Sequence, residues 1–424
     1  MTRRNTFSQY ALYLAIFLLP WQTRIIFDTL LIGGEPSEYG VLAIYATEVL
    51  IAIAYVLRGK LDYSDRARKI LQALYVVLAV GFFSISFTSV TTIAWFHMIH
   101  LLSATLFFSL ILDAHTNLKR LVLAFVGGLL VPAVLGVYQV LVGSSGASTV
   151  LGLAAKDASV AGVSVIENGA GRMMRAYGSF PHPNIFGGFL VVGLLLLAWL
   201  SRFIQSRSHT IALAIPTVIL SIALVLTFSR GAWLAMVFAG VALVAQMLLA
   251  RKTPPSRAIP LATLGLLTLL ITLGVFHSAV LARFNPDLRV EAISIEERTS
   301  QYGEFNKVFF SSTLLGVGPG VYTFALSQID SGRDVWAYQP VHNAGLLLTA
   351  ELGLAGLLVA LRFLYLLFKP IVTHKKIATR IFGVSIGLSI LTIGFFDHYL
   401  WSLWPGLVLM ALVFGVVARW NDAS

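Results

Sequence analysis

Residues that could carry chemistry gather late in the chain, in a polar interval from Arg283 to Ala350. Near the end of this interval lie His342 and Asn343, where a long apolar stretch begins. The free N–H groups and the dipole at the start of a helix there favour an anion and disfavour an imidazolium. His342 is therefore expected to stay neutral, which suits a general base. The alternatives are a histidine that only caps the helix, or a solvated loop without chemistry.

Arg230 is the clearest candidate for binding an anion. It lies in the short turn Phe228-Ser229-Arg230-Gly231 between two apolar runs. An arginine at membrane depth is costly and usually has a partner. A phosphate group is a suitable partner, because the guanidinium group binds two oxygens at once. The alternative is an arginine whose side chain extends to the lipid headgroups.

A second arginine, Arg298, follows the helical period of its neighbours. One apolar face is formed at helical spacing by Arg298, Tyr302, Phe305 and Phe309. This pattern predicts that Arg298 points toward the protein, and that Glu297, Gln301 and Glu304 point elsewhere. Arg289 is a nearby candidate for the same role. The alternative for Arg298 is a salt bridge on the protein surface.

Four further residues are candidates for binding the substrate. Arg175 and Asn184 flank a stretch that two prolines and a glycine should hold as a fixed turn. Asp397 lies in a short turn between the last two apolar runs, and its carboxylate could orient a histidine or an arginine. Asn343 completes the set, because it follows His342 directly.

Other patterns predict structure rather than chemistry. The turn Gly316–Gly320 lacks the Lys-Ser/Thr ending of a P-loop and is not expected to bind a nucleotide. Glu351 should point away from His342 and pair within the protein. No cluster of His, Asp or Glu has metal-ligand spacing, with Glu296-Glu297 a weak exception, so we expect no metal and no cofactor. The chain has no cysteine, which excludes disulfides and thiolate chemistry.

Membrane helices are the elements that must position these residues. The chain of 424 residues is 58% hydrophobic and 12% charged, whereas a soluble domain carries roughly 25% charged residues. Apolar runs recur along the whole length, which predicts an all-α, polytopic membrane protein. We expect twelve spans, at 8–27, 39–57, 70–89, 94–112, 121–143, 184–201, 210–228, 232–250, 258–280, 342–368, 381–396 and 405–418. The first run lacks the pattern of a cleaved signal peptide and is expected to be retained.

The charge distribution predicts the orientation. The loops on one side, including both termini, hold 19 of the 30 Lys and Arg residues and four of the 19 acidic residues. The positive-inside rule places these loops in the cytoplasm. The net charge of +11 is then explained without a nucleic-acid partner. Two long segments, 144–183 and 281–341, should lie on the opposite side as loops of a single membrane domain covering 1–424.

Taken in order, these motifs resemble the O-antigen ligase superfamily. The resemblance rests on the large late loop, the Ser229-Arg230-Gly231 turn, the R-x-x-G-S-F-x-x-P-N stretch from Arg175 to Asn184, and H-N-x-x-L…E-x-G from His342. It covers roughly residues 170–405, and the first five spans fit by topology alone. It implies a GT-C-like membrane glycosyltransferase in the bacterial inner membrane, with its active site on the periplasmic side.

The resemblance also implies a reaction. Such a ligase transfers O-antigen polysaccharide from undecaprenyl pyrophosphate to lipid A–core, and the donor's prenyl chain would lie in a groove between spans. Arg230 and Arg298 match the family's arginines and would stabilise the pyrophosphate leaving group. His342 matches its histidine and would deprotonate the acceptor hydroxyl, in a single displacement with inversion. The implied partners are this lipid-linked glycan, lipid A–core and membrane lipid.

Three alternatives stay open. An O-antigen polymerase would use the same donor, with a second lipid-linked glycan as acceptor. A protein O-oligosaccharyltransferase would transfer the glycan to a protein. A transporter of a small anion or lipid would need charged residues along the spans, where Glu48 and Arg362 are among the few candidates.

Overall fold

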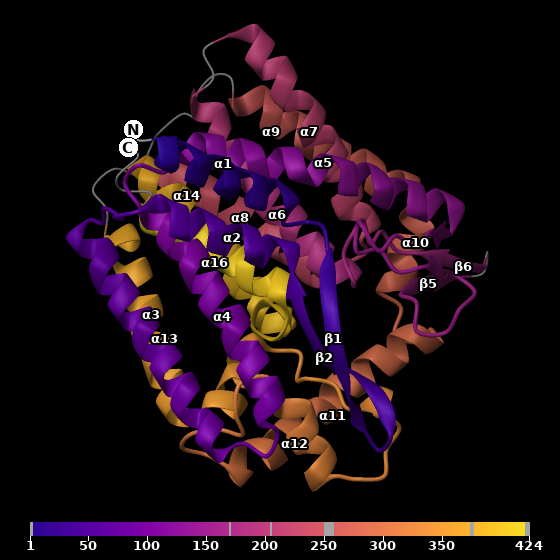
Figure 1. Cartoon of the computed structure of the whole chain (residues 1–424). Coiled ribbons are helices and arrows are strands. Elements are labelled where there is room, and N and C mark those ends of the chain that lie inside the picture. Colours follow the sequence, from indigo (N-terminus) through magenta and orange to yellow (C-terminus); the bar gives the residue numbers. More distant parts are fainter. Residues whose placement is uncertain (1–2, 169–170, 204–205, 250–257, 374–376, 420–424) are drawn as a thin grey trace.

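The chain folds into a bundle of helices with three small antiparallel strand pairs (Figure 1). The structure is a computed structural model that describes residues 3–168, 171–203, 206–249, 258–373 and 377–419. The first six helices are α1 (Arg3–Leu18), α2 (Ala46–Arg58), α3 (Asp65–Ser84), α4 (Thr91–Leu112), α5 (Leu118–Val142) and α6 (Pro183–Leu200). The later long helices are α7 (Arg207–Leu226), α8 (Arg230–Leu249), α9 (Ala258–Val275), α11 (Arg289–Ser311), α13 (Ala344–Val372), α14 (Ile377–Phe396) and α16 (Trp404–Arg419).

Seven of the described helices are long and apolar enough to cross a membrane: α3, α4, α5, α6, α7, α8 and α13. The pair α9 and α10 (His277–Arg283) would add an eighth span, bent by 83° at its break. The chain is therefore a mostly helical, multi-pass membrane protein. A helix lies at each of the twelve predicted positions. However, α1 and α2 have only 16 and 13 residues, whereas a span needs about 20, so the count of twelve stays a prediction.

The all-α prediction misses a β-hairpin near the start of the chain. The predicted spans 8–27 and 39–57 run into residues that form β1 (Arg24–Ile32) and β2 (Glu35–Tyr45) instead. Gly33-Gly34 forms the two-residue turn between the strands, and both glycines have positive φ, as such turns require. β1 contains three isoleucines, one threonine and one phenylalanine, residue types that favour a strand. The apolar character of these residues was predicted correctly, whereas the prediction that they are helical was wrong.

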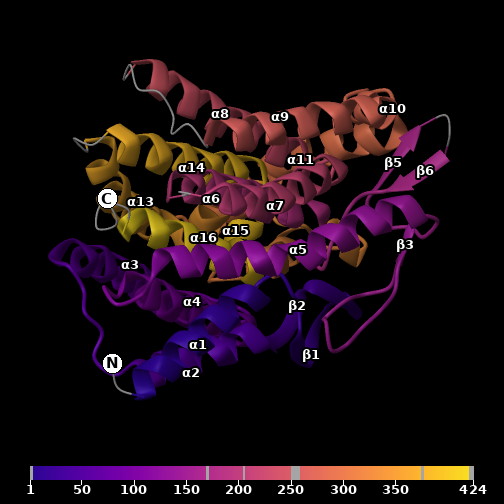
Figure 2. The same cartoon turned by 90° about the horizontal axis from the view of Figure 1, so that it is seen from above.

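Helix α6 lies at the centre of the bundle. It packs against α5, α7, α8 and α14. Seen from above, α8 and α9 lie on one side of α6, and α1 to α4 lie on the other side (Figure 2). Helices α14 and α16 lie between these two groups. Gly188 of α6 has no room for a side chain, because a Cβ atom there would lie 2.0 Å from the hydroxyl oxygen of Tyr399. This close approach brings α6 against α15 (Tyr399–Ser402).

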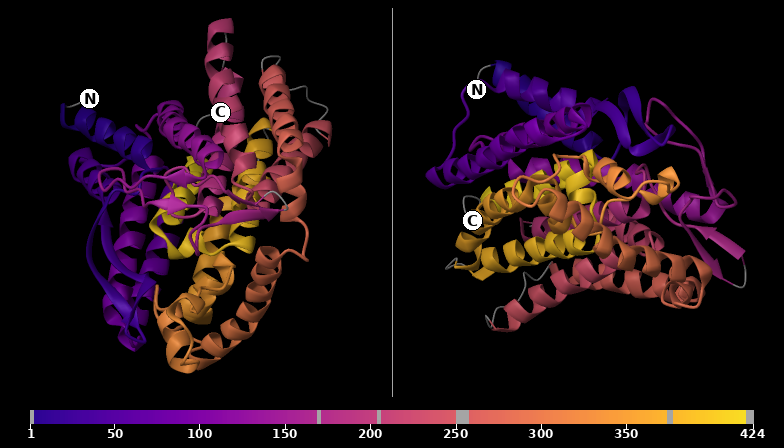
Figure 3. Two further views of the ribbon diagram at one scale, coloured as in Figure 1. Left: turned by 90° about the vertical axis from the view of Figure 1, so that its right-hand side faces the viewer. Right: turned by 90° about the horizontal axis from the view of Figure 1, so that it is seen from below.

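Both long segments between spans are structured. The late polar interval begins at the end of α10 and forms α11 and α12 (Tyr322–Ile329), with a 3-10 turn at Val335–Ala337. α11 and the β1–β2 hairpin lie on opposite sides of the lower end of the molecule (Figure 3, left). The earlier segment forms the pairs β3–β4 (Ser144–Ser145, Lys156–Asp157) and β5–β6 (Val165–Asn168, Gly171–Met174). β5 contacts α10, so the two segments meet.

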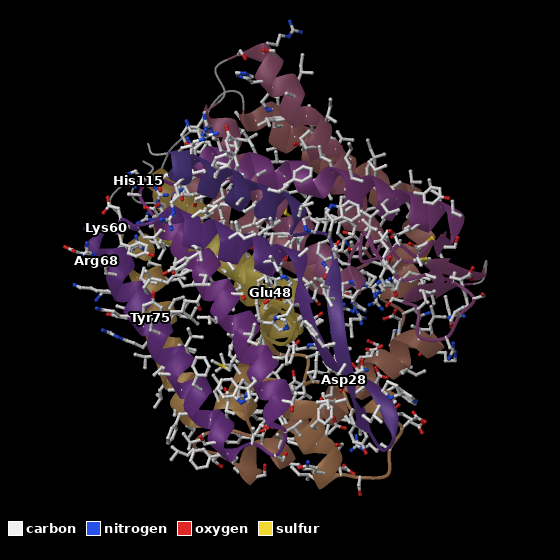
Figure 4. All side chains as sticks on the ribbon, in the orientation of Figure 1. Asp28, Glu48, Lys60, Arg68, Tyr75 and His115 are labelled. Carbon is white, nitrogen blue, oxygen red and sulfur yellow. The ribbon has the colours of Figure 1, made fainter. Side chains whose placement is uncertain are left out.

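Basic residues lie at the end of the molecule opposite α11 and α12. The start of α1 and the end of α16 lie at this end (Figure 1), as do Lys60, Arg68 and His115, whereas Asp28 lies on the hairpin (Figure 4). This placement agrees with the charge asymmetry behind the predicted orientation, which itself stays a prediction. Residues 250–257 and 374–376, in two of the predicted basic loops, lie outside the described residues.

Candidate active site

Three arginines converge on a small polar pocket between α6, α8, α10, α11 and the end of α14. Its polar lining is formed by Asn184, Ser229, Arg230, Arg283, Arg298, Asp397 and Tyr399. Four of these were predicted as site residues, whereas Ser229, Arg283 and Tyr399 were not. The Tyr399 hydroxyl is buried and has no hydrogen-bond partner among the described residues. The pocket therefore offers an unpaired hydroxyl together with three cations.

The turn before α8 places Arg230. Helix α7 ends at Leu226, and Phe228 then adopts a φ of 47°, which is uncommon for a residue other than glycine. The Ser229 hydroxyl accepts a hydrogen bond from the N–H of Ala232 at 3.3 Å, in the first turn of α8. Arg230 is consequently the first residue of α8. Backbone strain of this kind persists only where the surrounding structure holds it, and it is frequent at functional sites.

A buried carboxylate, Glu291, pairs with two of the three arginines. Its Oε2 lies 3.1 Å from Nη1 of Arg230, and its Oε1 accepts a hydrogen bond from Arg283. Arg283 also donates from Nε to the carbonyl of Phe228 at 3.0 Å. Arg298 makes no hydrogen bond or ion pair with any residue that the structure describes. Two cations are thus partly neutralised within the protein, and the third is left for a ligand.

Helix α11 turns a polar face inward. Its buried residues are Glu291, Gln301, Glu304 and Val308, while Tyr302 is 51% exposed. The prediction that Tyr302 lies on the buried face and that Gln301 and Glu304 point elsewhere is therefore wrong, although Arg298 does reach the pocket. Apolar residues usually mark the buried face of a helix. Helix α11 covers a polar site instead, so the side chains on its inward face are polar and have polar partners there.

His342 precedes α13 and is held by Gln301 of α11. The amide oxygen of Gln301 accepts a hydrogen bond from the backbone N–H of His342 at 3.1 Å and lies 2.7 Å from Nδ1 of its ring. A backbone N–H can only donate, so it fixes which side of the amide faces His342. Nδ1 must then carry the proton, and a neutral His342 has its lone pair on Nε2. Gln301 was not predicted as a site residue, because it lies 41 positions from His342 in the sequence.

The turn between α14 and α15 brings Asp397 and His398 to His342. The two imidazole rings meet edge to face, with centroids 5.1 Å apart. Asn184 donates to the Asp397 carboxylate at 2.8 Å, and the Asn184 oxygen accepts from Arg175 at 2.7 Å. Arg175 therefore holds Asn184, and through it Asp397, without lining the pocket itself.

Burial sets the charge state of this group. It lowers the pKa of His342, with Asp397 opposing the shift and Arg298 adding to it. Burial also lowers the pKa of His398 to about 4. Burial alone would raise the pKa of Asp397, but the neighbouring histidines and the Asn184 amide hold it below its ordinary value. At pH 7 the site therefore combines neutral imidazoles with a carboxylate anion.

The middle of the chain matches a known family. Residues 215–361 match the family model described as O-antigen ligase. This match supports assignment of the matched region to the O-antigen ligase/polymerase superfamily. Among curated proteins, no sequence matches the chain. The matched region runs from α7 into α13 and contains Arg230, Arg283, Arg298 and His342, whereas Asn184 and Asp397 lie outside it.

Besides Arg175, two predicted substrate-binding residues lie outside the pocket. Arg289 has a side chain that is 69% exposed and pairs with Glu167 at 2.8 Å. Asn343 caps α13, because its side-chain oxygen accepts a hydrogen bond from the N–H of Leu346 at 2.9 Å. Arg298 is therefore better placed than Arg289 to bind a ligand in the pocket. Among the described residues, no three His, Asp or Glu side chains are grouped to hold a metal ion.

An apolar cavity of about 350 Å³ lies between α3, α4, α13, α14 and α16. Much of its wall is aliphatic and aromatic, including Leu78, Leu101, Phe108, Phe363 and Phe414. Asn343 lines one part of it, so the cavity reaches the residue next to His342. Ile390 of α14 faces the cavity and Ile393 faces the arginine pocket. The two spaces therefore lie on opposite sides of the end of α14.

Proposed function

We propose that the chain is an O-antigen ligase, which transfers a polysaccharide from undecaprenyl pyrophosphate to lipid A–core at the periplasmic face of the bacterial inner membrane. The observation that carries the proposal is the position of the neutral imidazole of His342, which does not line the arginine pocket but contacts His398, the neighbour of the pocket residue Asp397. The pocket suits a pyrophosphate, and the imidazole suits a sugar hydroxyl. The superfamily match supports this class of reaction.

The donor pyrophosphate binds the arginines in this proposal. Arg298 has no internal partner to give up among the described residues, whereas Arg230 and Arg283 exchange contacts with Glu291 for contacts with phosphate oxygens. Guanidinium groups bind phosphate oxygens in pairs. Because the charge on the pyrophosphate grows as the sugar–oxygen bond breaks, arginines aimed at it stabilise the transition state more than the ground state.

The acceptor hydroxyl loses its proton to Nε2 of His342 while its oxygen attacks the anomeric carbon of the donor sugar. The bond from that carbon to the pyrophosphate oxygen breaks in the same step, and undecaprenyl pyrophosphate leaves with the bonding electrons. One displacement inverts the anomeric configuration and forms no covalent enzyme intermediate. Asp397 stays anionic beside the imidazole and stabilises the imidazolium that the proton transfer creates.

The apolar cavity provides space for the prenyl chain of the donor. Asn343 lines it, and the end of α14 and the short helix α15, which both contribute residues to the two spaces, separate it from the arginine pocket. A lipid whose headgroup lies among the arginines could therefore extend its chain around the end of α14. The proposal keeps the predicted orientation of a GT-C-like enzyme, with 144–183 and 281–341 in the periplasm and both termini in the cytoplasm.

A transport path gains no support from the two charged candidates within the spans. Glu48 accepts hydrogen bonds from the N–H of Tyr45 and lies 2.9 Å from Nδ1 of His100. Arg362 lies over the ring of Tyr365, 5.7 Å from its centroid. Both groups are held by neighbours, and neither lines the arginine pocket or the apolar cavity.

Lipopolysaccharide from a deletion strain tests the proposal against the polymerase alternative. Loss of a ligase leaves core-only lipopolysaccharide, with full-length polysaccharide still on its prenyl carrier. Loss of a polymerase leaves core capped by a single repeat unit. The proposal predicts the first pattern, and restoration of polymer-bearing lipopolysaccharide when the gene is returned. The second pattern, or unchanged lipopolysaccharide, would overturn it.

A further inference from the structure

Helix α13 is broken close to the site. Gly353 has φ 65° and ψ −170°, so the helix stops at Leu352 and starts again after Gly353. The first part, Ala344–Leu352, begins two residues after His342, with Asn343 as its cap. A break in a membrane-spanning helix leaves backbone N–H and C=O groups without intrahelical partners, which is costly away from water. The groups beside this break therefore need partners from elsewhere in the chain.

The glycine-rich turn of the late polar interval supplies these partners. Four backbone hydrogen bonds join the two segments: Val317 N–H to Ala350 O at 3.0 Å, Gly318 N–H to Glu351 O at 3.0 Å, Leu354 N–H to Thr313 O at 2.9 Å, and Ala355 N–H to Leu314 O at 3.1 Å. The fit depends on glycine at both contacts. A Cβ atom at Gly316 would lie 2.2 Å from the carbonyl carbon of Glu351, and one at Gly353 would lie 2.2 Å from the Leu314 oxygen.

The carboxylate of Glu351 connects this turn to the other half of the site. It is 2% exposed, and it accepts hydrogen bonds from the N–H of Gly320 at 2.8 Å and from the indole N–H of Trp401 at 2.7 Å. The N–H of Tyr322 lies 3.4 Å from its second oxygen. Glu351 therefore joins three segments, namely the first part of α13, the turn before α12, and α15.

Trp401 belongs to the segment that carries Asp397 and His398. Its backbone N–H donates to the carbonyl of His398 at 3.0 Å. The same segment already meets the start of α13, because Ala344 N–H donates to the carbonyl of Asp397 at 3.1 Å. The two segments are thus joined at two separate points. One contact lets two segments pivot about each other, whereas two contacts fix their relative orientation.

We propose that Glu351 is a positioning residue, which acts through Trp401 to hold His342 in register with Asp397 and His398. The proposal rests on the ligase function proposed above. Glu351 lines neither the pocket nor the apolar cavity, so it has no direct role in holding the donor. Loosening this contact should slow the chemical step, because reacting groups lose rate when their relative placement is poorly fixed.

The test compares Trp401→Phe with the matched variant Trp404→Phe. Both tryptophans are 4% exposed, and both donate from the indole N–H, Trp401 to Glu351 and Trp404 to the Thr47 hydroxyl at 2.9 Å. With purified protein, prenyl-pyrophosphate-linked glycan and lipid A–core, Trp401→Phe should lower kcat roughly tenfold, the upper end of what the loss of one hydrogen bond is expected to cost. The donor KM should stay within about twofold, and Trp404→Phe should change neither constant.

Two results in this assay would overturn the proposal. One is an equal loss of kcat in both variants. The other is a raised donor KM with unchanged kcat in Trp401→Phe, which would assign Trp401 to the apolar cavity that it also lines. Glu351→Gln is the second variant. Its amide oxygen can still accept from Gly320 and Trp401, so kcat should fall less than in Trp401→Phe, and a greater fall would count against the role of Trp401.

Hydrogen exchange separates the failure of this proposal from the failure of the ligase function. Amides in Ala344–Leu352 and Tyr399–Ser402 should exchange faster in Trp401→Phe than in the wild type, and at the wild-type rate in Trp404→Phe. Faster exchange in a protein that transfers no glycan would reject the ligase function and keep the contact as a structural one. Unchanged exchange and unchanged kcat in an active protein would reject the positioning role alone.

Discussion

The amide oxygen of Gln301 contacts both the backbone N–H of His342, at 3.1 Å, and Nδ1 of its ring, at 2.7 Å. Because the backbone N–H fixes the orientation of the amide, this one residue determines the tautomer of the imidazole. The lone pair is directed away from Gln301, on Nε2. Gln301 is 4% exposed, so water does not compete freely for the contact.

Gln301→Ala and Gln301→Glu should therefore differ in their pH profiles. The alanine variant loses the preference for one tautomer, and its rate should fall roughly fivefold at every pH, for a hydrogen bond worth about 1 kcal/mol. The glutamate variant keeps an acceptor but adds a negative charge, which raises the pKa of His342 and moves the loss of activity to higher pH. The pH dependence of kcat measures both effects. Identical profiles in the two variants would contradict the assignment of the tautomer.

Arg298→Lys should reduce transfer strongly, whereas Arg289→Ala should not. A lysine keeps the charge and loses the two-pronged contact with phosphate oxygens, and one such transition-state donor contributes about 10²–10³ in kcat. Arg289 has an exposed side chain and pairs with Glu167, so its loss should leave kcat within about twofold. Transfer rates measured at a saturating donor concentration compare the two variants. Activity lost in the Arg289 variant and kept in the Arg298 variant would reverse the assignment of the loop arginine.

Glu291→Gln should destabilise the protein and increase its response to pyrophosphate. Removal of one side of a buried ion pair costs about 3–5 kcal/mol, and Glu291 is the counter-charge of both Arg230 and Arg283. The Tm should fall, and added inorganic pyrophosphate should raise it by more than in the wild type. Glu296→Gln is the control, because Glu296 is exposed on the same helix. Equal pyrophosphate responses in all three proteins would show that the arginines do not bind this anion.

The orientation can be tested directly, because the chain contains no cysteine. Asp287→Cys and Ser331→Cys introduce thiols at exposed positions of the late polar interval, and Lys60→Cys introduces one at the opposite end. In intact spheroplasts a membrane-impermeant thiol reagent should label the first two and leave the third unlabelled until lysis. The reverse pattern would place the arginine pocket on the cytoplasmic side and remove the proposed substrates from its reach.

Residues that act through their own chemistry were predictable from the sequence. Arg230, Arg298, Asn184 and Asp397 line one pocket although they come from four different parts of the chain. Their types and local turns were sufficient to mark them, because an arginine or a carboxylate beside an apolar run is costly unless something pairs with it. The structure brings them together, and their roles in catalysis stay proposals.

Residues that act through long-range pairing were not predictable. Gln301 was expected to point away from the protein, yet its partner His342 is 41 positions later. Glu291 was one of several acids in a polar interval, with no local sign that it lies between two arginines. The β1–β2 hairpin was assigned to spans because apolar composition alone does not distinguish a strand from a buried helix. In each case the deciding contact joins segments that are distant in sequence.

In the proposed reaction, His342 is the base in a transfer whose donor is held by the arginines. The most direct measurement is the pH dependence of single-turnover transfer to lipid A–core, together with donor binding, for the wild type and His342→Gln. The pKa of His342 is lowered from its ordinary value of 6.5. Wild-type activity should therefore not vary with pH around pH 7, and it should fall at lower pH. His342→Gln should bind donor normally, lose this pH dependence and transfer about 10²–10⁴ times more slowly. A variant that keeps a near-native rate, or one that loses donor affinity and keeps the wild-type pH profile, would contradict the role of His342 as the base.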